Sequence, residues 1–73
     1  MNLATVRLFL EVAEAGSFSK VAARRQTAQS YLSRQITDFE AQCGAPLFRR
    51  TGRGVALTEL GERVAGRLRL WMQ

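Results

Sequence analysis

The chain has 73 residues, of which 47% are hydrophobic and 23% are charged, and its formal net charge at pH 7 is +5. One cysteine and no histidine exclude an internal disulfide and a zinc site built from Cys and His ligands, and they fit a reducing cytoplasm. Because the sequence shows neither a membrane-spanning apolar run nor a signal peptide, we expect one small cytoplasmic domain.

The chain begins with a predicted helix that Asn2 caps and Gly16 ends. Its predicted buried face consists of the apolar residues that recur at helical spacing: Leu3, Val6, Phe9, Leu10 and Ala13. Ser17 is the expected N-cap of a short second helix, which turns three apolar residues inward: Phe18, Val21 and Ala22.

A third helix is predicted over about residues 28–43, between a turn at residues 26–28 and Gly44. With about 100° between successive residues, its apolar side consists of Leu32, Ile36, Phe39 and Cys43. Its opposite side consists of Ser30, Ser33, Arg34 and Thr37. Because that side holds no carboxylate, it can enter a DNA major groove without repelling phosphates. Cys43 is predicted to be a small core side chain, with a redox role left open.

A basic β-hairpin, or wing, is predicted after Pro46, which cannot continue the helix. Residues 47–49 and 55–57 are its expected strands, and Gly52 and Gly54 in the turn are free to take positive φ. Phe48 in the first strand and Phe18 are assigned to the core. The order of elements predicts a mainly α winged helix-turn-helix, with three helices and a two-stranded wing.

A fourth helix is predicted to follow the wing, with Thr58 as its N-cap. Its apolar positions repeat at helical spacing: Leu60, Val64, Leu68 and Trp71. We expect Leu60 and Val64 to pack on the domain's own core, whereas the end of the helix has nothing of its own to cover it. That apolar end consists of Leu68, Trp71 and Met72, and it is expected to pair with another chain or to continue as part of a longer protein.

The positive charge is concentrated in one part of the chain. Residues 20–53 hold seven cations against two acids, whereas the remaining cations and acids cancel. Ten of the eleven cations are arginines, which suit bidentate contacts to phosphate or guanine. This concentration around the predicted helix-turn-helix favours a nucleic-acid partner over an ordinary solvated surface.

Three other classes of function compete with DNA binding. An enzyme is nearly excluded, because the chain lacks histidine, its one cysteine is predicted to lie in the core, and its acids form no recognisable catalytic motif. A membrane-surface helix fits poorly, because the cations are spread over a wing and three helices. A winged-helix protein–protein interaction module is the alternative. The net charge of +5 and the absence of acids on the outer face of the third helix argue against it.

A set of short motifs extends over essentially the whole chain: residues 13–18 (Ala-Glu-Ala-Gly-Ser-Phe), Ala22 and Ala23, residues 29–30 and 32–36, and residues 46–50 (Pro-Leu-Phe-Arg-Arg), 52–54, 57–58 and Gly61. With these motifs the sequence resembles the LysR-type transcriptional regulators. The resemblance implies a bacterial DNA-binding domain at residues 1–57 and the start of a linker or dimerisation helix at residues 58–73. A small-molecule effector would bind a separate C-terminal domain, and no cofactor or metal is implied for this one.

The resemblance also implies roles for individual residues. The expected base readers are Gln29, Ser30, Ser33 and Tyr31. The expected backbone and wing contacts are Arg34, Arg53, Thr27, Ser17 and Arg50. The wing, at about residues 49–55, is expected at the minor groove of the DNA, which the Arg53 side chain enters. Arg34 is expected both to contact a phosphate and to pair with Asp38 four residues later.

As partners, the resemblance implies double-stranded promoter DNA and a second copy of the chain, bound antiparallel through the last helix. Such a homodimer would bind an imperfect palindrome in the bacterial nucleoid. A tetramer and contact with RNA polymerase are left open.

Three positions depart from the family pattern. Ala28 stands where Ser or Thr usually caps the recognition helix, which leaves Thr27 as an alternative cap. Arg25 stands where Leu is usual, so either a core contact is lost or a phosphate contact is gained. Tyr31 stands where a small residue is usual, which affects how bases are read.

Overall fold

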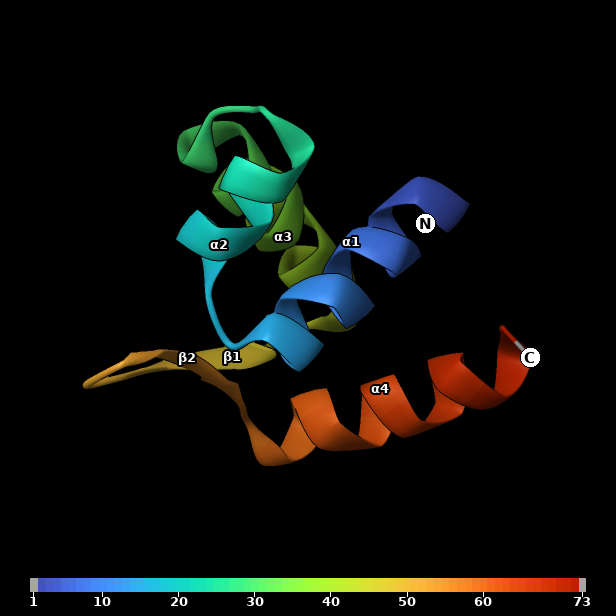
Figure 1. The fold of residues 1–73 in the computed structure, drawn as a ribbon. Helices are drawn as coiled ribbons and strands as arrows, with labels where there is room; N and C mark the ends of the chain where they lie inside the picture. The colour runs from blue at the N-terminus through green and yellow to red at the C-terminus, as the bar shows by residue number, and fades with distance from the viewer. Residues whose placement is uncertain (1, 73) are drawn as a thin grey trace.

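The computed structural model describes residues 2–72, which fold into four helices and one two-stranded antiparallel sheet (Figure 1). The elements follow in the order α1 (Leu3–Ala15), α2 (Phe18–Arg25), α3 (Gln29–Cys43), β1 (Phe48–Thr51), β2 (Gly54–Leu57) and α4 (Glu59–Trp71). The predicted mainly α winged helix-turn-helix is therefore confirmed, with the hairpin as the wing.

The predicted ends of the first helices are confirmed by their caps. The Asn2 side chain accepts a hydrogen bond from the Thr5 N–H at 2.8 Å, and the Ser17 hydroxyl accepts one from the Lys20 N–H at 3.1 Å. Gly16 and Gly44 end α1 and α3 in the left-handed region, with φ of 68° and 87°. Short oxygen-bearing side chains and glycines therefore delimit these helices, as expected from the unpaired backbone groups at helix ends.

Helix α1 lies at the centre of the fold, between α2 and α3 on one side and α4 on the other (Figure 1). Its buried side chains are Val6, Leu8, Phe9 and Val12. The predicted stripe was therefore wrong in part, since Leu3 is 46% exposed and Leu10 and Ala13 are only half-buried. A helix covered on several sides buries more than the single stripe that periodicity identifies.

Aromatic rings connect α1, α2, α3 and the wing. The Phe9 ring lies 5.4 Å from the rings of both Phe39 and Phe48, and Phe18 lies 5.7 Å from Phe48. Tilted and edge-on pairs at this separation are favourable beyond their buried area. Phe18 and Phe48 thus belong to the core, as predicted, although each remains partly exposed.

The apolar side of α3 also faces the core. Leu32, Ile36 and Phe39 are buried against α1 and α2. Cys43 is half-buried at the end of the helix and packs against the same core, so it is less enclosed than predicted.

The wing differs in detail from the predicted hairpin. Its strands pair from Phe48 with Leu57 to Thr51 with Gly54, so β1 begins and ends later than expected. Only Gly54 takes a positive φ, of 152°, whereas Gly52 does not. The Val55 N–H donates to the Gly16 carbonyl at 3.0 Å, and a Cβ on residue 54 would overlap that carbonyl. Gly54 therefore lets the hairpin lie against the turn between α1 and α2.

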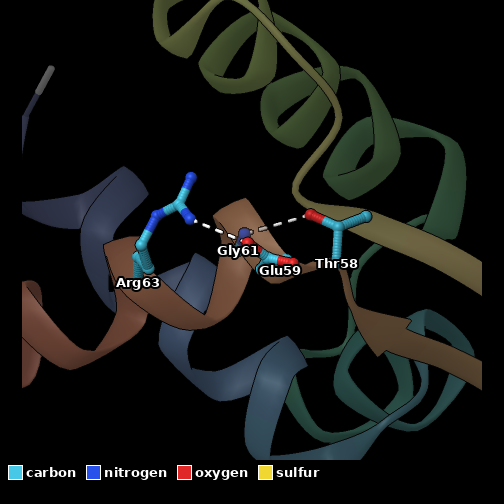
Figure 2. Close-up of polar contacts among 4 residues, drawn as sticks. All are labelled: Thr58, Glu59, Gly61 and Arg63. Atoms are coloured by element: carbon cyan, nitrogen blue, oxygen red, sulfur yellow. Dashed lines mark hydrogen bonds and ion pairs between the residues drawn. The ribbon is translucent and has the colours of Figure 1, made fainter.

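Helix α4 begins at the predicted cap. The Thr58 hydroxyl accepts from the Gly61 N–H at 3.0 Å, and Arg63 pairs with Glu59 one turn later at 3.0 Å (Figure 2). The same hydroxyl donates to the Pro46 carbonyl at 2.9 Å, which ties α4 to the segment before the wing.

The packing of α4 corrects one prediction. Leu68 packs against the core together with Leu60 and Val64, so it does not belong to the uncovered end of the helix. The exposed apolar side chains there are Leu70 and Trp71, which are 70% and 67% exposed, and Met72 is half-buried. One face of α4 therefore packs against the core along most of its length, whereas the apolar side chains at its C-terminal end are exposed.

We predict opposite effects of alanine at two glycines of α4. A Cβ on Gly61 would overlap the Leu47 carbonyl oxygen, whereas a Cβ on Gly66 meets nothing within 4 Å. Gly61→Ala should lower the free energy of unfolding by about 1–3 kcal/mol, as overpacking does. Gly66→Ala is the matched control and should raise it by up to about 1 kcal/mol, because alanine is the better helix former. Urea unfolding measures both, and equal effects would contradict the close contact at Gly61.

Candidate nucleic-acid interface

The turn between α2 and α3 leads into the exposed N-terminal end of the third helix, at residues 28–31. Gln26 ends α2 with φ of 55°, and its N–H donates to the carbonyls of Ala22 and Ala23. The Thr27 N–H donates to the Ala22 carbonyl at 3.0 Å. Left-handed backbone is uncommon outside glycine, and here it lets a chain reversal fit between two helices with no glycine. The N-terminus of α3 therefore projects from the domain.

Helix α3 begins without a side-chain cap. Its N-cap residue is Ala28, and no side-chain hydrogen bond closes this end, so Thr27 does not take over the capping role. Amide groups in the first turn of a helix that lack a capping side chain remain available to solvent or to an anion.

The predicted base readers lie near this end of α3 but not all on one side. Gln29, Ser30, Tyr31 and Arg34 are exposed, and Ser33 is half-buried. Tyr31 lies about 160° around the helix from Ser33. The Tyr31 hydroxyl is paired with the Gln35 amide at 3.4 Å, along the helix. Ser30 lies between Ser33 and Arg34 around the helix, about 60° and 40° from them, whereas Tyr31 lies on the side away from Ser33.

Arg34 does not form the predicted ion pair with Asp38. Within residues 2–72 the ion pairs are Arg25 with Glu11 and Arg63 with Glu59. The Arg34 guanidinium is exposed and unpaired in that described range, and it is available to an external anion.

Arg25 has an intramolecular partner. Its guanidinium contacts the Glu11 carboxylate at 2.6 Å and links the end of α2 to α1. Arg25 is exposed and forms a surface ion pair, so the core contact that Leu would make at this position is lost, which is the first of the two alternatives. Arg25 therefore contributes little to the positive charge available beside α3.

The wing adds a basic surface next to α3. Arg49, Arg50 and Arg53 are exposed, and the Arg53 N–H donates to the Thr51 hydroxyl at 3.2 Å near the tip. A cavity of about 180 Å³ lies between α3 and the base of the wing, where its polar lining includes Ser33, Thr37, Glu40, Arg49 and Arg50. Hydroxyls of the helix and guanidiniums of the hairpin therefore border the same depression.

Two weaker candidates are already engaged within the domain. The Ser17 hydroxyl caps α2 and also lies 3.0 Å from the Ser19 hydroxyl. Thr27 is half-buried beside the turn. Their predicted phosphate contacts would have to be made in addition to these roles.

Sequence reasoning missed the role of Glu40. Its carboxylate oxygen Oε2 accepts hydrogen bonds from the backbone N–H groups of Leu47 and Phe48, at 2.7 and 3.1 Å. Glu40 thus lies beside the face that was predicted to be free of acids, but its charge is directed at the backbone. The available signal was an acid near a helix end followed by Gly-Ala-Pro, because N–H groups after such a reversal need acceptors.

Two kinds of feature are not found in the described part of the chain. Residues 2–72 contain no group of three or more His, Cys, Asp or Glu side chains placed to hold a metal ion. Among the described helices, none is both long and apolar enough to cross a membrane.

Comparison with known sequences gives one consistent result. Residues 3–62 match the family model described as bacterial regulatory helix-turn-helix protein, lysR family. The chain is 45% identical over 62 residues to the HTH-type transcriptional regulator TfdT of Cupriavidus pinatubonensis, which covers 85% of this chain and 27% of that protein. It is 47% identical over 62 residues to the regulator BudR of Raoultella terrigena, covering 85% of this chain and 21% of that protein. The chain thus spans about a quarter of the length of these relatives.

Solved structures show the same fold. The DNA-binding domain of CbnR in complex with DNA has a TM-score of 0.88 and 32% identity, covering 99% of this chain and 83% of that one. The BenM DNA-binding domain in complex with catB site 1 DNA has a TM-score of 0.88 and 35% identity, covering 99% of this chain and 77% of that one.

We predict that Ala28→Ser stabilises the domain. A serine hydroxyl at this position would accept from an amide of the first turn of α3, and such caps contribute about 0.5–2 kcal/mol to the free energy of unfolding. Ala41→Ser makes the same change at an exposed position inside α3 and should be neutral or slightly destabilising. Thermal and urea unfolding measure both, and equal stability of the two variants would show that the first turn needs no cap.

Proposed function

Because the chain belongs to the lysR family of bacterial regulatory helix-turn-helix proteins, whose DNA-binding domain it contains, we propose that it binds a specific operator as a homodimer. In this proposal α3 enters the DNA major groove and the wing reaches the adjacent minor groove. The family is one of transcriptional regulators and not of enzymes.

One observation carries the proposal. The polar side of α3, with exposed Ser30 and Arg34 and half-buried Ser33, lies beside a wing that presents three exposed arginines, because Ser33, Arg49 and Arg50 border the same depression. Support also comes from the relatives of the same fold, since the CbnR and BenM domains were crystallised with DNA. A polar helix face of this kind bordered by guanidiniums fits a duplex, which offers base edges between two rows of phosphates.

The side chains of α3 divide into readers and anchors. Gln29 has a paired donor and acceptor that match the N6 and N7 atoms of adenine. Ser30 and Ser33 read bases directly or through water, and Tyr31 contacts the edge of the same site. Arg34 binds a phosphate and orients the helix.

The wing and the turn hold the DNA backbone. Arg53 lies in the turn of the hairpin and enters the minor groove, where narrow A·T-rich segments attract arginine. Arg50 contacts a phosphate from β1, and Ser17 and Thr27 contribute weaker phosphate contacts beside α2.

The second copy of the chain binds through the end of α4. Leu70 and Trp71 are the exposed large apolar side chains of this helix, with Met72 beside them. Antiparallel pairing of two such helices would cover these side chains and relate the domains by a two-fold axis. Two α3 helices would then reach successive major grooves, so the operator would be an imperfect palindrome.

The remaining family properties are proposed for a longer protein. An effector-binding domain, a tetramer and contact with RNA polymerase are proposed for a protein of the relatives' full length, of which this chain covers about a quarter. The location in the bacterial nucleoid follows from the proposed operator.

We predict that Gln29→Ala and Arg34→Ala differ in kind. Gln29→Ala should remove discrimination at one base pair and cost about 1–3 kcal/mol on the preferred site only. Arg34→Ala should weaken binding to all sequences and reduce the magnitude of the slope of log K against log salt by about one. Fluorescence anisotropy with the selected site and single-base variants, at several salt concentrations, separates the two effects.

Two outcomes would contradict these assignments. The same uniform loss in both variants would remove the distinction between reader and anchor. A wild-type affinity that does not change with salt would contradict DNA binding itself, because each neutralised phosphate should contribute a slope of about −0.9.

We predict that Trp71→Asp breaks the dimer, because it places a charge in the proposed apolar contact. Sedimentation should show a monomer, and the preference for a full palindrome over a half-site should disappear. Gln42→Asp adds the same charge to an exposed side chain of α3 and should leave the dimer intact. If Trp71→Asp stays as dimeric as the control, the chain must dimerise through another surface.

A further inference from the structure

We propose that Glu40 is a positioning residue for DNA binding, which sets the direction of the wing relative to α3. The inference rests on the proposed function, because it requires that α3 and the wing contact one DNA site together. Glu40 itself touches no base or phosphate in this proposal and acts through the backbone of β1.

The first argument is the geometry of the carboxylate. One oxygen of Glu40 accepts from two successive backbone N–H groups, those of Leu47 and Phe48, at 2.7 and 3.1 Å. The carboxylate is half-buried between the last turn of α3 and the first residue of β1. Hydrogen bonds to an ionised acceptor are shorter and stronger than neutral ones, so this contact resists rotation of the strand against the helix.

The second argument is that Leu47, the residue just before β1, anchors the wing to the rest of the domain. Its side chain is fully buried, and its carbonyl accepts from the Thr58 N–H at 2.9 Å. The peptide groups at the start of β1 are therefore held by α3 through Glu40, and at the end of the hairpin by the start of α4. Glu40 thus joins α3 to the start of β1 through hydrogen bonds from its carboxylate to two backbone N–H groups.

The third argument is the position of the negative charge. Glu40 borders the depression that also contains Ser33, Thr37 and two wing arginines. A carboxylate on a surface that meets phosphates weakens binding through charge repulsion. The two backbone bonds give this acid a role that compensates for that repulsion, and they direct its charge at the N–H groups of Leu47 and Phe48.

The length of the hairpin amplifies a change at its base. A four-residue strand extends roughly 13 Å, so a rotation of about 10° at residues 47–48 moves the tip by roughly 2 Å. Arg53 lies at that tip. A displacement of this size removes a hydrogen bond or a minor-groove contact, whereas the side chains of α3 stay in place.

The test uses three variants of the 73-residue chain with the same change in charge. Glu40→Ala removes both bonds, Glu40→Gln keeps an oxygen acceptor of the same shape, and Asp38→Ala removes a neighbouring acid of α3 for which no contact with the wing is seen within residues 2–72. Each is made with and without Arg53→Ala. Affinities are measured for one operator core with A·T-rich or G·C-rich flanks, and amide exchange of Leu47 and Phe48 is measured without DNA.

We expect Glu40→Ala to uncouple the wing from DNA. Its Leu47 and Phe48 amides should exchange at least about tenfold faster than in the wild type, as protected amides do when they are released locally. Arg53→Ala should cost about fivefold or more in the wild type but less than about twofold with Glu40→Ala, since coupled residues are not additive. The A·T preference should disappear while discrimination by Gln29 persists. Glu40→Gln and Asp38→Ala should keep the Arg53 effect and the A·T preference.

Each contrary result has a definite meaning. Faster exchange in Glu40→Ala together with an unchanged Arg53 effect would overturn this inference alone. Loss of the Arg53 effect in Asp38→Ala would overturn it too, because charge and not position would then be responsible. Absence of sequence-dependent binding by the wild type would overturn the proposed function as well. Should Glu40→Ala not fold, Glu40→Asp keeps the charge but shortens the reach by one methylene, and the same outcomes decide.

Discussion

The peptide groups around Leu47 are the constraint on which the arrangement of the wing depends. Leu47 is buried, its N–H donates to Glu40 of α3, and its carbonyl accepts from Thr58 at the start of α4. Position 61 accommodates only a glycine, because a Cβ there would overlap the same Leu47 carbonyl. A chain reversal after α3 would otherwise leave polar backbone groups unpaired beside the core, which is costly. The same contacts that avoid this cost also fix where the hairpin begins.

Much of the fold could be predicted from local chemistry. The caps Asn2, Ser17 and Thr58 and the left-handed Gly16 each act through neighbours in the chain, so their signals are readable in sequence. The buried face of α1 was harder to predict. Leu8 and Val12 are buried because several elements cover this helix at once, and periodicity assumes a single covered side.

The candidate site likewise has features that could be predicted from the sequence and features that could not. Exposure of Gln29, Ser30 and Arg34 could be predicted from the helix pattern, since it depends only on which side faces the core. The pairing of Arg25 with Glu11 and the bonds from Glu40 join residues that only the tertiary fold brings together. Leu68 illustrates the same limit, because only the path of α4 across the domain decides whether it is covered.

The separation of the two sides of α3 has an evolutionary consequence. Within residues 2–72, the side chains of Ser30, Ser33 and Arg34 make no hydrogen bond that holds the domain together, whereas Leu32, Ile36 and Phe39 fill its core. In the proposed DNA complex, substitutions on the outer side therefore change which DNA is recognised at little cost in stability, whereas substitutions on the inner side lower stability without changing the contacts to DNA. On that proposal, the domain can acquire a new operator by a few surface changes while its scaffold stays the same.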